Sequence, residues 1–214
     1  MRRTTINSIR NGRTHVLAAI RFIANNRLVY GMLGLYIFGV LLGSLAVKYG
    51  SEPIVGELGA ILSGYIGQRA DQTFLPAFLS SFTMNFLVLF LVFFLGFCAI
   101  APPVILFIAV GKGVSVGVAI GYLYASTGST GMWYAVQNLV PVSLIASFAT
   151  ILACASSYKL SCIYFSMFSH KQAENSVSDA AEAYLTRYVV YTILIFVSAL
   201  VDGLCCTVFG GISP

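Results

Sequence analysis

The chain contains few charged residues. Asp, Glu, Lys and Arg make up only 9% of its 214 residues, whereas a soluble domain carries about 25%. Hydrophobic residues make up 58%, and the mean hydropathy is +0.90. This scarcity of charge excludes an ordinary soluble fold. The composition indicates an integral membrane protein. The length allows one compact bundle of about five or six helices and no large soluble domain.

Residue types that perform catalysis or bind metals are also scarce. His15 and His170 both lie in polar or interfacial segments, and there is no HExxH motif, Walker motif or DNA-binding pattern. No serine has a His or Lys placed to activate it. We therefore expect no enzyme activity, metal, cofactor or nucleic acid. The cysteines lack CxxC spacing and are expected to fill apolar spans: Cys98, Cys154, Cys162, Cys205 and Cys206.

The basic residues gather before the first apolar run. Residues 1–27 contain six arginines and no acid, a pattern that holds this end of a membrane protein in the cytoplasm. The apolar residues between Val16 and Ala24 fall at helical spacing, so part of the segment is either an interfacial helix on anionic lipid or only a topology signal. The arginines are Arg2, Arg3, Arg10, Arg13, Arg21 and Arg27.

Long apolar runs predict an all-α, polytopic membrane bundle. About 20 apolar residues cross a bilayer core of roughly 30 Å. Five spans within a single transmembrane domain, 28–214, place the carboxyl end outside the cell. The basic residues of the later segments agree, since Lys159, Lys171 and Arg187 would then lie inside and only Lys48 and Arg69 outside. The spans are expected at about 28–47, 82–101, 103–124, 135–158 and 188–209.

Two polar segments separate these spans. In the first, Lys48 to Ser81, apolar residues repeat at three and four, which predicts a short amphipathic extracytoplasmic helix from about Pro53 to Gly67. Its face either packs on the bundle or contacts a partner through Leu58, Ile61 and Leu62. The second is 159–187. Its first part is still apolar, which leaves open whether the fourth helix continues past the membrane interface.

Glycines recur every four residues in two of the spans. Gly113, Gly117 and Gly121 fall on one face of the third span, and Gly39 and Gly43 form a similar pair in the first. Faces without side chains let membrane helices approach closely. We expect these glycines to lie at helix–helix contacts.

A few polar residues interrupt the spans. Lys112 and Asp202 are the charges within them, and Asn85 and Asn138 are expected to join helices by hydrogen bonds. Lys112, near the middle of its span, either extends its side chain to the interface or lies at a break. In the second case Pro102-Pro103 and Gly111-Lys112-Gly113 would bound a broken or re-entrant segment near residues 101–113.

The residues by themselves leave two classes of function. One is a scaffold that positions partner proteins. The other is a transporter or permease subunit with a site at the Gly111-Lys112-Gly113 break. Transporters usually carry paired broken helices in repeated halves, and only one such segment is present here. The sequence therefore favours the scaffold.

The stretch FLGFCAIAPPVILFIAVGKGVSVGVAIGYLYASTGSTGMWYAVQNLVP resembles the core of the stage II sporulation protein M family. The shared pattern is an apolar span, a proline-bearing turn and a glycine-rich outward helix. The basic amino-terminal segment, the length and the number of spans also fit. The matching residues are Gly96, Pro102 or Pro103, Gly111, Lys112, Gly113, Gly117, Gly121, Gly128, Gly131, Asn138 and Pro141.

The resemblance implies a role without catalysis. Such proteins anchor an engulfment complex in the mother-cell membrane of endospore-forming bacteria. They localise the stage II sporulation proteins D and P, which are peptidoglycan hydrolases needed for septal thinning and engulfment. The resemblance supplies no catalytic residues and leaves homo-oligomer formation open.

Overall fold

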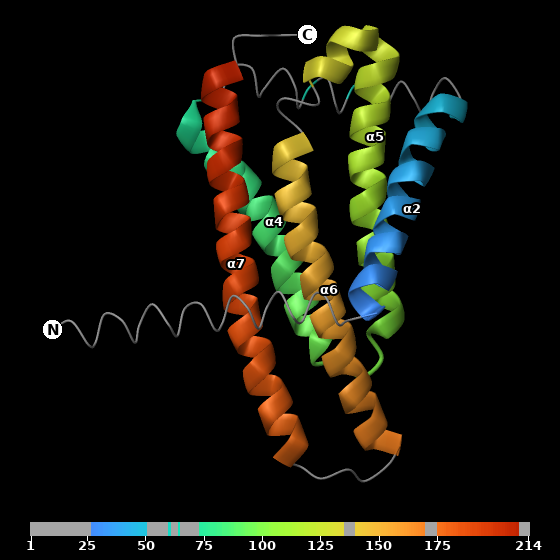
Figure 1. Ribbon diagram of the computed structural model, residues 1–214, viewed down its shortest axis with the longest axis vertical. Coiled ribbons are helices and arrows are strands. Elements are labelled where there is room, and N and C mark those ends of the chain that lie inside the picture. Colours follow the sequence, from blue (N-terminus) through green and yellow to red (C-terminus); the bar gives the residue numbers. More distant parts are fainter. Residues whose placement is uncertain are drawn as a thin grey trace, which may run out of the picture.

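Five α-helices make up the part of the chain that the computed structural model describes, which is residues 27–50, 60, 64, 73–134, 140–169 and 175–209. They are α2 (Arg27–Tyr49), α4 (Phe74–Gly96), α5 (Pro102–Tyr134), α6 (Val140–Ser169) and α7 (Asn175–Phe209) (Figure 1). Each contains a stretch long and apolar enough to cross a membrane, and none of the described residues forms a strand. The predicted all-α polytopic bundle is confirmed.

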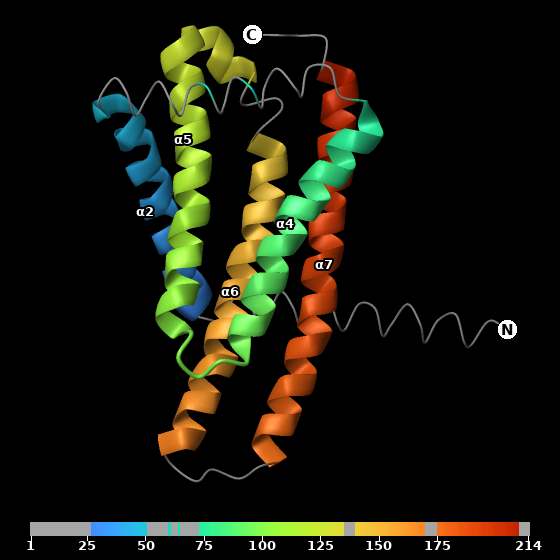
Figure 2. The same cartoon turned by 180° about the vertical axis from the view of Figure 1, so that it is seen from behind.

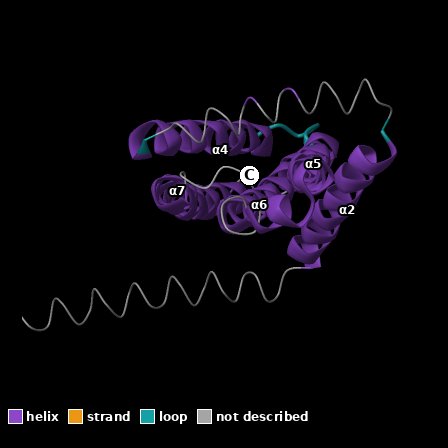
Figure 3. Cartoon of the chain, turned by 90° about the horizontal axis from the view of Figure 1, so that it is seen from above, coloured by secondary structure: helices purple, strands orange, loops and turns teal. Residues whose placement is uncertain are grey.

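Helix α6 is the centre of the bundle. It contacts each of the other four helices, and most of it is buried, whereas most of α4 is not. The view from above shows α6 between the α2/α5 pair and the α4/α7 pair (Figure 3). Small side chains let four helices approach it closely. The buried small residues of α6 are Ala146, Ser147, Ala149, Thr150, Ala153, Cys154, Ala155, Ser156, Ser157 and Ser161.

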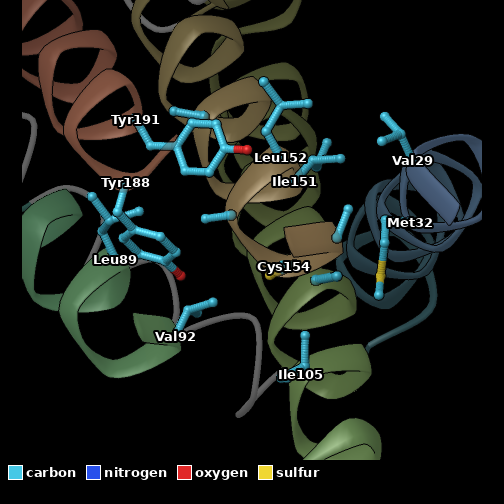
Figure 4. Close-up of a cluster of buried hydrophobic side chains, with 14 of the residues drawn as sticks. Val29, Met32, Leu89, Val92, Ile105, Ile151, Leu152, Cys154, Tyr188 and Tyr191 are labelled. Carbon is cyan, nitrogen blue, oxygen red and sulfur yellow. The ribbon is translucent and has the colours of Figure 1, made fainter. Parts of the chain in front are cut away.

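All five helices contribute side chains to one apolar core around α6 (Figure 4). Large side chains from the outer helices fill the space left by its small residues, as close packing requires. Members of this core, by helix, are Val29 and Met32 of α2, Leu89 and Val92 of α4, Ile105 of α5, Ile151 and Leu152 of α6, and Tyr188 and Tyr191 of α7.

Helix α4 is displaced from its expected span of 82–101. It begins at Phe74 and ends at Gly96, because its first turns are apolar and aromatic and pack on α7. The ring of Phe196 meets those of Phe78 and Phe82 edge-on, with centroids 5.5 and 6.0 Å apart. These contacts lean α4 toward α7.

Helix α5 is continuous at residues 102–113, where the sequence allows a break. Pro102 and Pro103 occupy its first turn, where a proline loses no helical hydrogen bond. Gly111, Lys112 and Gly113 are all helical, and the one non-helical residue within α5 is Gly128, with φ 61°. The prediction of a broken or re-entrant segment near residues 101–113 is therefore wrong. The chain reverses instead between Phe97 and Ala101.

The segment 159–187 is more helical than its polarity suggested. Helix α6 continues to Ser169, which is the continuation that the apolar first part of this segment left open. Helix α7 already begins at Asn175, well before the expected start of its span near 188. Both helices extend past the others at one end of the bundle (Figure 1). Residues 1–26, and the expected amphipathic helix from Pro53 to Gly67 except for Ala60 and Gly64, lie outside the described residues.

Candidate functional site

The predicted glycine faces of α2 and α5 lie against each other. A Cβ added to Gly113 would meet the backbone carbonyl oxygen of Tyr36, and one added to Gly117 would meet that of Val40. From the other side, Gly39 faces the carbonyl of Val110. Gly43 faces that of Val114 in the same way, while a Cβ at Gly121 would lie 3.3 Å from the Cα of Ser44.

The contact between α2 and α5 is therefore made backbone to backbone. A methyl group at Gly113 or Gly117 would have to displace main-chain atoms, because no flexible side chain stands in its way. In lipid no hydrophobic driving force brings helices together, so their association depends on van der Waals packing. The close approach of α2 and α5 increases that packing. Gly31 and Gly34 of α2 and Gly111 and Gly128 of α5 have no such neighbour within 4 Å.

Lys112 and Asn85 join α5 to α4. The Lys112 ammonium donates a hydrogen bond of 2.8 Å to Oδ1 of Asn85, and both side chains are partly buried. Asn85 lies at the midpoint of α4, and Lys112 near the middle of its span. The expectation that Asn85 joins helices by a hydrogen bond is met. Lys112 neither lies at a break nor pairs with Asp202.

The other polar residues predicted within the spans do not lie at the Lys112–Asn85 bond in the described part of the chain. Asp202 is on α7 and only 2% exposed. The next residue, Gly203, packs against the ring of Phe74 at the start of α4. Asn138 and the expected partner-contact residues Leu58, Ile61 and Leu62 lie outside the described residues.

A buried hydroxyl cluster, which no sequence motif singles out, joins α6 to α7 and α4. Ser157 Oγ lies 2.9 Å from Tyr184 Oη and 2.7 Å from Tyr188 Oη, while Ser156 Oγ lies 2.8 Å from Tyr191 Oη. Tyr184 also donates to the carbonyl oxygen of Phe93 at 2.9 Å. The helical spacing of the three tyrosines is visible in the sequence, but Tyr184 lies in the segment 159–187, whose charged residues predict a polar connection.

Two further serines complete these links. Ser161 donates to the carbonyl oxygen of Cys98, just past the end of α4, and Ser198 of α7 donates to that of Val142 at 3.0 Å. In hydrocarbon an unsatisfied polar group is costly, so hydroxyls that find partners across helices hold those helices together.

These contacts join helices to one another. Within the described ranges, no group of three or more His, Cys, Asp or Glu side chains could hold a metal ion. Lys112 bonds to Asn85 across two helices, and the serine and tyrosine hydroxyls described above bond to one another or to backbone carbonyls outside their own helix. Fold and site together define a multi-pass helical membrane protein whose interior is built for helix packing.

The family follows from comparison with known proteins. The family model for stage II sporulation protein M matches residues 32–206, which is most of the chain. The chain therefore belongs to the stage II sporulation protein M family, as its resemblance indicated. No curated protein and no solved structure matches it.

Proposed function

We propose that this protein is a membrane scaffold that anchors and localises peptidoglycan-degrading enzymes for septal thinning and forespore engulfment. The observation that carries the proposal is membership of the stage II sporulation protein M family over residues 32–206. The partners expected are hydrolases of the stage II sporulation D and P type. The scaffold itself performs no reaction.

The architecture supports a scaffold. The helices expose large apolar side chains where lipid would surround them, among them Leu41, Leu87 and Phe107. The hydroxyl cluster and the Lys112–Asn85 bond join helices to one another, as described above. The alternative of a transporter or permease subunit rested on a break at Gly111-Lys112-Gly113, and α5 is a continuous helix there.

The proposed orientation places the amino end in the cytoplasm and the carboxyl end outside. Helix α2 starts on the side of the bundle where the α4–α5 connection lies, and α7 ends on the opposite side (Figure 1). The α2–α4 and α5–α6 connections would then lie on the outer side, where wall enzymes work. The location proposed is the mother-cell membrane at the septum.

Fluorescence microscopy of the partner enzymes tests this function. Fluorescently tagged hydrolases of the D and P type are followed in sporulating cells of the native host, with and without this protein. We expect them at the septum in its presence and dispersed around the membrane in its absence. Unchanged septal localisation in cells lacking the protein would refute the scaffold role.

A further inference from the structure

The charge of Lys112 has no counter-ion among the described residues. Its one hydrogen-bond partner there is the neutral amide of Asn85, at 2.8 Å. Lys112 is about 15 Å along α5 from the helix start at Pro102, at a rise of 1.5 Å per residue, which is near the middle of a bilayer core of about 30 Å. Ionisable groups at that depth usually pair with one another or with backbone carbonyls, and no such carbonyl bond is made by Lys112 within the described residues.

Helices α4 and α5 meet near their short connection and diverge from it (Figures 2 and 3). The phenylalanine contacts with Phe196 lean α4 toward α7, whereas the glycine contacts hold α5 against α2. Lys112 and Asn85 bridge the two helices. Their neighbours, one position or one helical turn away, form what we call the α4–α5 face: Ser81, Met84 and Val88 of α4 and Ile108, Gly111 and Ser115 of α5.

This face is open to another helix. Met84 is 70% exposed, Ser115 and Gly111 are exposed, and a Cβ at Gly111 would meet no atom within 4 Å. The glycine and serine leave room for close approach beside Lys112. An apolar surface alone would be covered by lipid, but a lysine at this depth favours an occupant with a negative charge.

Two sources of negative charge can be set aside. A lipid headgroup lies at the membrane surface, about 15 Å from the bilayer centre. A second copy of this chain offers only Asp202 deep within a span, and that side chain is 2% exposed. Glu182, the other acid within the spans, lies at the very start of its span, which begins at Ala180.

We propose that the α4–α5 face binds the transmembrane helix of a partner protein that carries an Asp or Glu near its midpoint, and that this carboxylate pairs with Lys112. The inference rests on the proposed function only in that the protein recruits other membrane proteins. It adds the place of binding and the chemistry of the partner helix.

Photo-crosslinking from the α4–α5 face tests the inference. The probe is p-benzoylphenylalanine in place of Ser115, in the full-length protein and native-host membranes, with adducts identified by mass spectrometry. The control position is Ile37, which is exposed on α2. We expect an adduct from position 115 to a transmembrane segment containing Asp or Glu, and no such adduct from position 37. Adducts with phospholipid alone would overturn the inference.

Two variants separate charge from hydrogen bonding. Lys112→Met and Asn85→Leu both remove the Lys112–Asn85 bond, but only the first removes the charge. Losing one member of a buried charge pair typically weakens binding about 30-fold or more, so Lys112→Met should reduce the adduct by at least that factor, while Asn85→Leu retains it. Equal loss in both variants, or none in Lys112→Met, would contradict the proposal.

A charge swap completes the test. Lys112→Glu should lose the adduct and regain it when the partner's acid is replaced by lysine. If Lys112→Met does not fold, Lys112→Gln supplies a neutral side chain that can still bond to Asn85.

Hydrolase localisation without this adduct would leave the scaffold function standing and refute the inference. An adduct with the acid-bearing helix of a protein unrelated to peptidoglycan would support the inference and contradict the scaffold function.

Discussion

Ser156 and Tyr191 illustrate how single hydroxyl groups join helices where water is absent. Their oxygens are 2.8 Å apart in the buried centre of the bundle. Water cannot replace this bond at such a site, so each hydroxyl depends on the other. The same reasoning applies to Ser157, which lies between Tyr184 and Tyr188.

A double-mutant cycle measures this coupling. Ser156→Ala, Tyr191→Phe and their combination should show a coupling energy of about 0.6 kcal/mol, the average for hydrogen bonds between membrane helices. The measurement is reversible unfolding in mixed micelles. Ser115→Ala is the control partner, because its hydroxyl bonds to the carbonyl of Gly111 within its own helix. Coupling between Ser115 and Tyr191 should be absent, and equal coupling in both cycles would contradict the assignment.

At the scale of elements, the α2–α5 contact depends on glycine. Gly117→Ala places a methyl group against the carbonyl oxygen of Val40, so α2 must move, and overpacking of this kind costs about 1–3 kcal/mol. Gly111→Ala is the matched control on the same helix, since a Cβ there meets nothing within 4 Å. Thermal unfolding in detergent should show a lower melting temperature for Gly117→Ala alone. Equal effects of the two substitutions would contradict the glycine contact.

The segment between α2 and α4 is proposed to contact the partner enzymes. Leu58→Asp with Ile61→Asp would place charges on the apolar side of the expected amphipathic helix, and we predict that recruitment of the hydrolases is lost. Ser63→Asp is the control, because helical spacing puts it on the opposite side. Co-localisation of tagged hydrolases is the measurement. Normal recruitment by a folded double variant would exclude this contact.

The helices themselves could largely be predicted from the sequence, because apolar length alone identifies a membrane span. Their ends could not. Asn175 to Arg187 contains charged residues but continues α7, since Tyr184 and Tyr188 are drawn into the core by packing that only the folded bundle supplies. The start of α4 at Phe74 likewise depends on contacts with α7.

Part of the site could also be predicted from the sequence, and the rest depends on which helices pack together. Glycine spacing indicated that Gly113 and Gly117 form a contact face, although not that α2 is their partner. The depth of Lys112 indicated an unusual cost and left snorkelling or a break as alternatives, whereas its bond to Asn85 depends on where α4 lies. The alanine- and serine-rich centre of α6 is visible in the sequence and becomes informative only once four helices are seen around it.

At the scale of the whole molecule, the orientation in the membrane can be tested directly. Reporter domains inserted at Gln172 and Thr130 would lie at opposite ends of the bundle. We predict that a fluorescent protein at Gln172 is active and alkaline phosphatase there is not, with the converse at Thr130. This follows from the excess of arginine before α2. The reverse pattern would place the α2–α4 connection in the cytoplasm, away from the wall.

Co-purification is the most direct test of the scaffold function. Tagged protein is isolated from detergent-solubilised membranes of sporulating native-host cells, and the proteins bound to it are identified by mass spectrometry. The predicted result is two peptidoglycan hydrolases, one that cuts glycan strands and one that cuts stem peptides. An ATPase or a second permease subunit without either hydrolase would contradict the scaffold function and favour a transporter.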